Sequence, residues 1–264
     1  MNPTVVNFGG GVNSTAMLGG MVERHMPFDL VLFADTGGER PETYHHVDAV
    51  SNWLSSRGFP RIHTVRWIRQ TGEFISLEQA CIEQNMLPSL AYGNKGCSSK
   101  WKAYPADKFV KSVFSEHIES GGRVTRCLGF DAGEERRAKD REHETWDFRY
   151  PLIEWGWDRA ECLQAIQRLG LPRAAKSSCF FCPAMKRHEV KALREEHPDL
   201  YERAIKMERN AHLTMVRGLG RGWSWEAAMK ADDDQGSLFP PLISCDCYDG
   251  DDDSDDAALG REGT

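Results

Sequence analysis

The sequence has few features of a secreted or membrane-bound protein. Its first 22 residues carry no ionisable side chain, so the basic start of a signal peptide is missing. The same stretch is rich in Gly, Asn, Ser and Thr and lacks the continuous apolar length of a membrane span. No internal repeat is visible. We therefore expect a cytoplasmic protein with no membrane partner.

Cysteines are also few, but they are unevenly placed. Eight in 264 residues are too few for a disulfide scaffold, and a cytosolic chain would keep them reduced. Two close pairs stand out, Cys179-x-x-Cys182 and Cys245-x-Cys247. In an intracellular protein such pairs indicate metal or redox chemistry more often than crosslinks.

Positive charge is scarce at the C-terminal end. From residue 232 onward ten Asp and one Glu face one Arg, which gives −10; subtracting this from the net charge of −7 leaves +3 for the other 231 residues. A mildly basic body fits a nucleotide or nucleic acid ligand, and it equally fits an ordinary solvated surface. The acidic run at 249–256 is of low complexity and predicted to be disordered.

Short apolar runs alternate with amphipathic stretches along the chain. Predicted strands lie at 4–8, 30–34, 62–67 and 124–130, with helical patterns at 14–24, from Pro41, and from about residue 160 onward. This alternation predicts an α/β fold with an open, mostly parallel sheet wound by helices and a helical C-terminal part. The expected divisions are an α/β domain at 1–158, a helical part with the Cys-x-x-Cys at 159–231, and an acidic, largely disordered tail at 232–264.

Three consecutive glycines, Gly9 to Gly11, separate the first predicted strand from the first helix. Glycines allow close backbone approach, and the N–H groups at a helix N-terminus can hold an anion. The hydroxyls of Ser14 and Thr15 can cap the helix or donate to phosphate. The spacing is neither the Rossmann fingerprint nor a Walker loop, so a flexible capped turn is the alternative. The candidate phosphate-binding residues are Phe8, Gly9, Gly10, Gly11, Asn13, Ser14 and Thr15.

The second predicted strand ends in Asp35-Thr36-Gly37 and is followed by Pro-Glu-Thr at 41–43. With these two segments the chain resembles the PP-loop superfamily, specifically its phosphoadenylyl-sulfate (PAPS) reductase-like branch. The resemblance implies an adenine nucleotide alpha hydrolase-like fold, with the nucleotide-binding PP-loop domain at 1–158 and the adenine contacted by the backbone of 32–35. The family's first loop reads Ser-Gly-Gly-x-Asp-Ser, and this chain departs from it at Gly9 and Asn13.

Further segments match in family order up to Cys182. Residues 96–105 resemble a Cys-x4-Lys-x2-Pro segment, and 129–138 resemble a Gly-Ile-Arg-x-x-Glu-x-x-Arg loop that begins at Gly129. Asp131 stands where that loop has its Arg. Lys102, Arg136 and Arg137 are candidate phosphate or sulfate ligands, since guanidinium groups suit such oxyanions; an exposed surface pair is the alternative for the two arginines.

The spacing of Cys97, Cys179 and Cys182 resembles that of adenylyl-sulfate reductases and DNA-phosphorothioation PP-loop enzymes. That resemblance implies a 4Fe–4S cluster, with Ser98 where a paired enzyme has its second cysteine. The fourth ligand is then Cys245 or Cys247, or one iron stays open to bind sulfur. A structural zinc is the alternative, because thiolates bind zinc as well as iron–sulfur clusters.

The leading hypothesis is an enzyme of the PP-loop ATP pyrophosphatase and sulfurtransferase kind. It would adenylate a nucleic acid or small-molecule substrate with ATP, release pyrophosphate, and transfer sulfur to the substrate. A protein that donates sulfur or electrons is the expected partner. Mg²⁺ is a candidate cofactor bound together with the nucleotide. The candidate catalytic residues are Ser14, Lys102, Arg136 and Arg137. The alternatives are a sulfonucleotide reductase that releases sulfite, and a non-catalytic nucleotide sensor with structural zinc.

Overall fold

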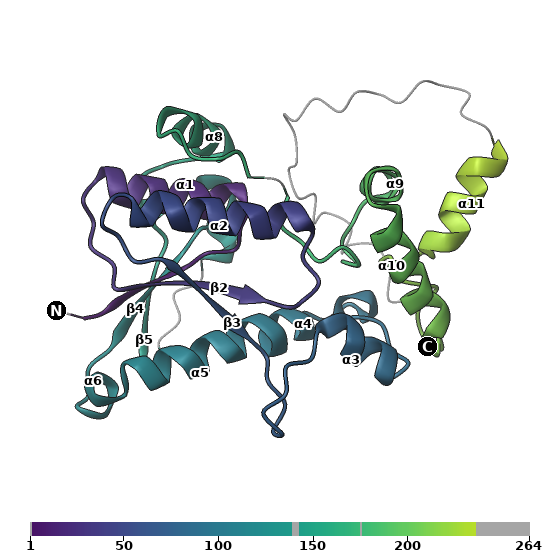
Figure 1. Ribbon diagram of the computed structural model, residues 1–264, viewed down its shortest axis with the longest axis horizontal. Coiled ribbons are helices and arrows are strands. Elements are labelled where there is room, and N and C mark those ends of the chain that lie inside the picture. The colour runs from purple at the N-terminus through teal and green to yellow at the C-terminus, as the bar shows by residue number, and fades with distance from the viewer. Residues whose placement is uncertain (1, 139–142, 175, 236–264) are drawn as a thin grey trace, which may run out of the picture.

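A parallel β-sheet forms the centre of the molecule. The computed structural model describes residues 2–138, 143–174 and 176–235 (Figure 1). All neighbouring strands are parallel, in the order β3-β2-β1-β4-β5. The strands are β1 (Thr4–Asn7), β2 (Leu30–Asp35), β3 (Ile62–Arg66), β4 (Val124–Leu128) and β5 (Trp146–Arg149). The predicted open, parallel α/β sheet is confirmed. The sequence patterns do not predict β5, an edge strand with charged residues at two of its four positions.

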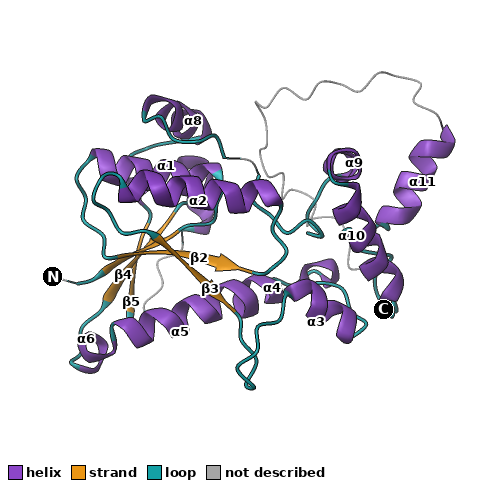
Figure 2. Cartoon of the chain, in the orientation of Figure 1, coloured by secondary structure: helices purple, strands orange, loops and turns teal. Residues whose placement is uncertain are grey.

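Helices cover both faces of the sheet (Figures 1 and 2). One face carries α1, α2, α7 and α8, and the other carries α5 and α6. The helices of the first face are α1 (Val12–Glu23), α2 (Pro41–Ser55), α7 (Pro151–Glu154) and α8 (Arg159–Arg168), and those of the second are α5 (Tyr104–Val113) and α6 (Ser115–Glu119). Because both faces are covered, β2 reads as a continuous apolar run from Leu30 to Ala34.

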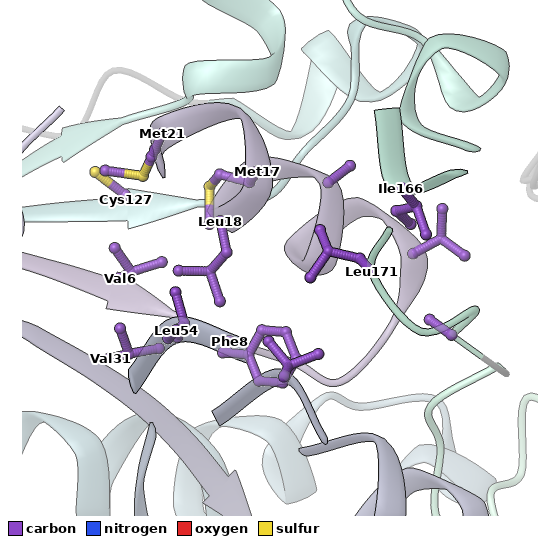
Figure 3. Packing of buried hydrophobic residues seen from close by; sticks show 14 of the residues in the cluster. Val6, Phe8, Met17, Leu18, Met21, Val31, Leu54, Cys127, Ile166 and Leu171 are labelled. Carbon is purple, nitrogen blue, oxygen red and sulfur yellow. The ribbon is translucent and has the colours of Figure 1, made fainter. Parts of the chain in front are cut away.

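The core between the sheet and the first helical face is apolar and closely packed. Met17 and Leu18 of α1 share this core with Val6 of β1 and Val31 of β2 (Figure 3). Ile166 of α8 belongs to the same cluster, so α8 packs with the α/β body rather than with the later helices. Successive strand residues point to opposite faces, which places Val5 and Leu32 in a separate cluster under α5.

A second core holds the C-terminal helices together. It joins α3 (Leu77–Glu83) to α9 (Arg187–Glu196), α10 (Pro198–Asn210) and α11 (Trp225–Gln235). This confirms the predicted helical C-terminal part. Four short helical segments complete the described chain: η1 (Ser89–Tyr92), α4 (Gly96–Ser98), the π-helical η2 (Ser99–Ala103) and η3 (Ala132–Arg137).

Two sequence predictions concern parts of the chain beyond Gln235. The predicted acidic tail lies outside the described residues from 236 onward, as do Cys245 and Cys247. Within the described part, no helix combines the length and the apolar character needed to cross a bilayer.

Candidate functional site

The glycine loop connects β1 to α1 at the carboxyl edge of the sheet. Gly11 is the N-terminal cap residue of α1, and no side chain caps that end of the helix. Gly10 has a φ of +78°, and a Cβ there would lie 3.0 Å from the Thr43 side chain. A residue with a side chain is therefore strained at this position. The loop leaves the N–H groups of the first turn of α1 without a side-chain acceptor, which is the arrangement that suits an anion.

The hydroxyls after the loop bond to the loop itself. Ser14 Oγ and Thr15 Oγ1 donate to the Gly11 carbonyl at 3.0 and 2.9 Å. Thr15 is completely buried, and its hydroxyl also lies 2.8 Å from His46 Nε2. Burial lowers the pKa of His46, which favours the neutral imidazole. Thr15 therefore stabilises the loop from inside the protein, while Ser14 borders its outer turn.

Asn13 lies at the centre of a polar network that joins three segments. Its Nδ2 donates to Asp131 Oδ2 at 2.9 Å and to Glu134 Oε2 at 3.1 Å, and its Oδ1 accepts from Arg159 Nη1 at 3.1 Å. Asn13 and Asp131 are two positions at which the sequence departs from the PP-loop pattern, and here they are hydrogen-bonded partners. A carboxylate at residue 13 would face two other carboxylates. The two departures therefore compensate each other.

The loop after β4 packs directly on the first turn of α1. A Cβ at Gly129 would lie 3.1 Å from the backbone N and Cα of Ser14, so only glycine allows this approach. Further along, Arg136 and Arg137 are exposed on η3. Arg137 forms an ion pair with Glu134, and its guanidinium lies 4.4 Å from the centre of the Phe130 ring. The structure thus places both arginines on the surface beside the Asn13 network.

Asp35 is a structural residue at the end of β2. Its buried carboxylate accepts hydrogen bonds from Arg66 Nε at 2.8 Å, the Tyr44 hydroxyl at 2.9 Å and the Gly37 N–H at 2.7 Å. Burial and the neighbouring Asp35 carboxylate raise the pKa of Tyr44, which keeps the phenol protonated. These bonds fix the turn that carries Thr36. The hydrogen-bond partners of the Asp35 carboxylate are therefore groups of the protein itself.

The Cys-x-x-Cys turn lies between the end of β2 and the glycine loop. Thr36 Oγ1 is 3.0 Å from Cys179 Sγ, and the Phe180 N–H donates to the Gly38 carbonyl at 2.8 Å. Ser177 covers the loop, because a Cβ at Gly11 would lie 3.0 Å from Ser177 Oγ. The glycine loop and the thiols therefore share one location, although Thr36 and Cys179 are 143 residues apart in sequence.

A buried ion pair borders the turn. Lys102 Nζ donates to Glu39 Oε1 at 3.0 Å, and the Glu39 side chain is fully buried. Burial is the largest single influence on Lys102 and favours the neutral amine, but the Glu39 carboxylate and the nearby Cys179 and Cys182 together raise its pKa. Burial, followed by the Glu39 carboxylate, also raises the pKa of the Cys179 thiol, and the Lys102 ammonium acts in the opposite direction. Without a further ligand, Cys179 is therefore a protonated thiol at neutral pH.

Of seven buried side-chain polar atoms without a hydrogen-bond partner in the described chain, three belong to the two segments that meet at the Cys-x-x-Cys turn. They are Glu39 Oε2, Arg40 Nε and Ser178 Oγ. An unsatisfied buried polar atom costs about 1–3 kcal/mol. Because a bound ligand can satisfy such atoms, the two segments are a candidate ligand site.

Cys97 approaches the same region from the start of α4. Its N–H donates to Ser89 Oγ at 2.6 Å. Burial raises the pKa of the Cys182 thiol, and Cys97 adds to that effect, so the two sulfur atoms are electrostatic neighbours. Cys97, Cys179 and Cys182 all pack against the second core. The donor chemistry fits an iron–sulfur cluster or zinc. Within the described chain, however, no three Cys, His, Asp or Glu side chains are placed to bind a metal ion.

The structure adds residues to the site that sequence patterns did not single out. Glu39, Ser177 and Ser178 border the Cys-x-x-Cys turn, and Arg159 completes the Asn13 network. The two serines directly precede Cys179, and Glu39 follows the Asp-Thr-Gly segment. Their positions next to these motifs could have identified them from the sequence. No sequence signal identifies Arg159.

Comparison with known proteins gives distant matches. No family model matches the chain. It is 25% identical over 236 residues to an uncharacterized protein of Methanocaldococcus jannaschii, in a match that covers 84% of this chain and 44% of that protein. The chain thus spans less than half the length of this curated relative. Among solved structures, it is similar to the U34-tRNA thiolase NcsA from Methanococcus maripaludis with its 4Fe–4S cluster. The TM-score is 0.43 and the identity 14%, covering 84% of this chain and 77% of the thiolase.

Proposed function

We propose that this protein is a PP-loop enzyme that binds an adenine nucleotide at the glycine loop and carries out sulfur transfer at the adjacent cysteines. One observation supports it above the others. Ser177 lies on Gly10 and Gly11, and Cys179 contacts Thr36, so the fold joins an anion-binding loop to a thiol pair. An enzyme that activates a substrate with ATP and then replaces oxygen by sulfur needs this proximity, since the activated intermediate must react before water attacks it.

The glycine loop would hold the nucleotide phosphates. The backbone N–H groups at the N-terminus of α1 have no side-chain cap and would bind an anion, and the Ser14 hydroxyl borders them. The backbone of residues 32–35 would contact adenine. Asn13 is a neutral amide held by Asp131 and Arg159, so it orders the loop without adding negative charge next to the phosphates. Arg136 and Arg137 on η3 would bind the outer phosphates or a substrate anion.

The cysteines would hold the sulfur-handling group. Cys97, Cys179 and Cys182 are the proposed ligands of a 4Fe–4S cluster, with Cys245 or Cys247 as the fourth ligand, or with one iron left open. Such a cluster supplies a soft site that carries sulfide or electrons. Lys102 would stabilise the thiolate charge, because its ammonium group already favours ionisation of Cys179.

The first experiment separates this proposal from structural zinc. Protein purified without oxygen is analysed for iron, sulfide and zinc, and its visible spectrum is recorded. We expect brown protein with iron and sulfide, and a strong loss of both in Cys97→Ala and Cys182→Ala. Colourless protein that carries stoichiometric zinc would contradict the cluster.

The second experiment tests the nucleotide chemistry. Pyrophosphate release from ATP is measured with single-stranded nucleic acids as candidate acceptors. Sulfite release is measured in parallel with adenylyl-sulfate and its 3′-phosphorylated form, with a small thiol as the two-electron reductant. Pyrophosphate without sulfite supports the sulfurtransferase. Sulfite release would instead identify a sulfonucleotide reductase, and tight nucleotide binding without either product would identify a sensor.

The reductase is retained as the second candidate because of Asn13. This amide stands where the PP-loop pattern has an acid, so the loop lacks a carboxylate that could bind the Mg²⁺ of an ATP complex. A sulfonucleotide needs no such metal, and its sulfate could be bound by Arg136 or Arg137. The matched assays above decide between the two.

A further inference from the structure

A groove with a volume of about 740 Å³ opens beside Cys97, away from the glycine loop. It lies between the end of β3, helix α3 and the segment formed by α4 and η2. Its wall includes the aromatic residues Trp67, Tyr92, Trp101 and Tyr104. None of the glycine-loop residues lines it. The volume is in the range of small-molecule and nucleotide sites.

The groove offers aromatic faces together with positive charge. The rings of Trp67 and Trp101 are 4.9 Å apart at 46°, and Lys100 Nζ lies 5.0 Å from the centre of the Trp67 ring. Lys100 is the one charged residue among the described residues that line the groove, and no carboxylate lines it. Tyr104 is 57% exposed. This combination selects a flat ring that carries an anion.

The position of the cysteines gives the groove a role. Cys97 lines the groove, and Cys182 packs against the same core as Cys97. Cys179 contacts Thr36 on the other side, next to the glycine loop. The cysteines therefore lie between two separate binding spaces, one suited to phosphates and the other to an aromatic ring.

We propose that this groove binds one unstacked base of a single-stranded nucleic acid, with the base against Trp67 and a neighbouring backbone phosphate at Lys100. The stacking of bases on aromatic side chains and the attraction of phosphate to lysine are the two recurrent interactions in such complexes. The Lys100 side chain is exposed, so it can leave the Trp67 ring to meet the phosphate. The inference rests on the proposed function, because it makes the base the acceptor that is presented to Cys97.

The test measures binding of the full chain to fluorescein-labelled single strands of about ten nucleotides, as RNA and as DNA, by fluorescence anisotropy at two salt concentrations. We expect Trp67→Leu to weaken binding about tenfold or more and Trp67→Phe to weaken it less, because phenylalanine still stacks. Lys100→Glu is expected to weaken binding and to reduce its salt dependence. Lys108→Glu on the exposed side of α5 is the matched charge control and should retain the affinity. The RNA and DNA arms identify the preferred sugar.

Two results would overturn the inference. One is unchanged oligonucleotide affinity in both Trp67→Leu and Lys100→Glu, with unfolding curves equal to the parent. The other is a dimer in light scattering that Trp67→Leu dissociates, which would make the groove an interface between two copies. ATP binding measured on the same variants keeps the proposals separate. If ATP fails to bind while Trp67 still controls oligonucleotide binding, the proposed function fails and the groove assignment stands.

Discussion

The Asn13 network and the Glu39 ion pair differ in how completely their polar groups are bonded. The Asn13 amide uses both its oxygen and its nitrogen, with Arg159 on one side and Asp131 and Glu134 on the other. Around Glu39, by contrast, one carboxylate oxygen, the Arg40 Nε and the Ser178 hydroxyl are buried without partners.

This difference leads us to expect a structural role for the Asn13 network and a functional role for the groups around Glu39. A saturated network gains nothing from a ligand and serves to hold the loop after β4 on α1. Unpaired buried groups destabilise the folded protein, and they are found where a ligand binds them or an active site requires them. The Glu39 side is therefore where we expect the chemistry, and the Asn13 side is where we expect the scaffold. Four substitutions or measurements test this contrast.

The largest effect is expected from Lys102→Met. It leaves the fully buried Glu39 carboxylate without its cation. Breaking a buried ion pair costs about 3–5 kcal/mol, and we expect about 3 kcal/mol because Lys102 is 38% exposed. Urea unfolding at pH 7 measures the loss, and Lys108→Met is the exposed control. The double variant Glu39→Gln with Lys102→Met should recover part of the stability; no recovery would contradict the pairing.

Asn13→Asp is expected to cost about 2 kcal/mol of unfolding free energy, since hydrogen bonds to charged groups are replaced by carboxylate repulsion. The same urea titration measures it. Adding Asp131→Asn should restore the stability by exchanging the amide and the acid between the two positions. If Asn13→Asp alone matches the parent, the network is not the scaffold described here.

Gly10→Ala compares a glycine of the site with a glycine outside it. Gly10 and Gly58 have the same φ of +78°, but a Cβ at Gly58 has nothing within 4 Å. Both alanine variants should lose about 1–2 kcal/mol through the left-handed backbone. Only Gly10→Ala should also lose nucleotide binding, measured by calorimetry with ATP. Equal ATP affinity in the two variants would contradict ATP binding by the glycine loop.

The smallest effect concerns pH and His46. Its pKa is lowered from the usual 6.5 by burial, so the unfolded chain binds more protons than the folded one as the pH falls through 6.5. Stability should therefore decrease between pH 7 and pH 5. Thermal unfolding of the parent and of His46→Gln across that range measures the contribution, and parallel curves for the two proteins would exclude it.

Much of the fold follows from local patterns, whereas much of the site does not. Apolar runs predict β1 to β4, and Pro41 marks the start of α2. The glycine loop and the Cys-x-x-Cys are visible as motifs. The contact between Asn13 and Asp131 spans 118 residues and that between Lys102 and Glu39 spans 63. Such pairs are set by the strand order, which periodicity does not specify.

The Phe180–Gly38 hydrogen bond also has a consequence for the order in which the protein forms. The turn that carries Cys179 is anchored by Phe180 and Phe181, which are buried in the second core, and it closes onto β2 across most of the chain. Chains fold from the N-terminus as they leave the ribosome, and contacts between distant segments form late. The α/β body can therefore take shape while both thiols of the turn are still open to solvent. We expect the burial of both thiols to follow the folding of the α/β body.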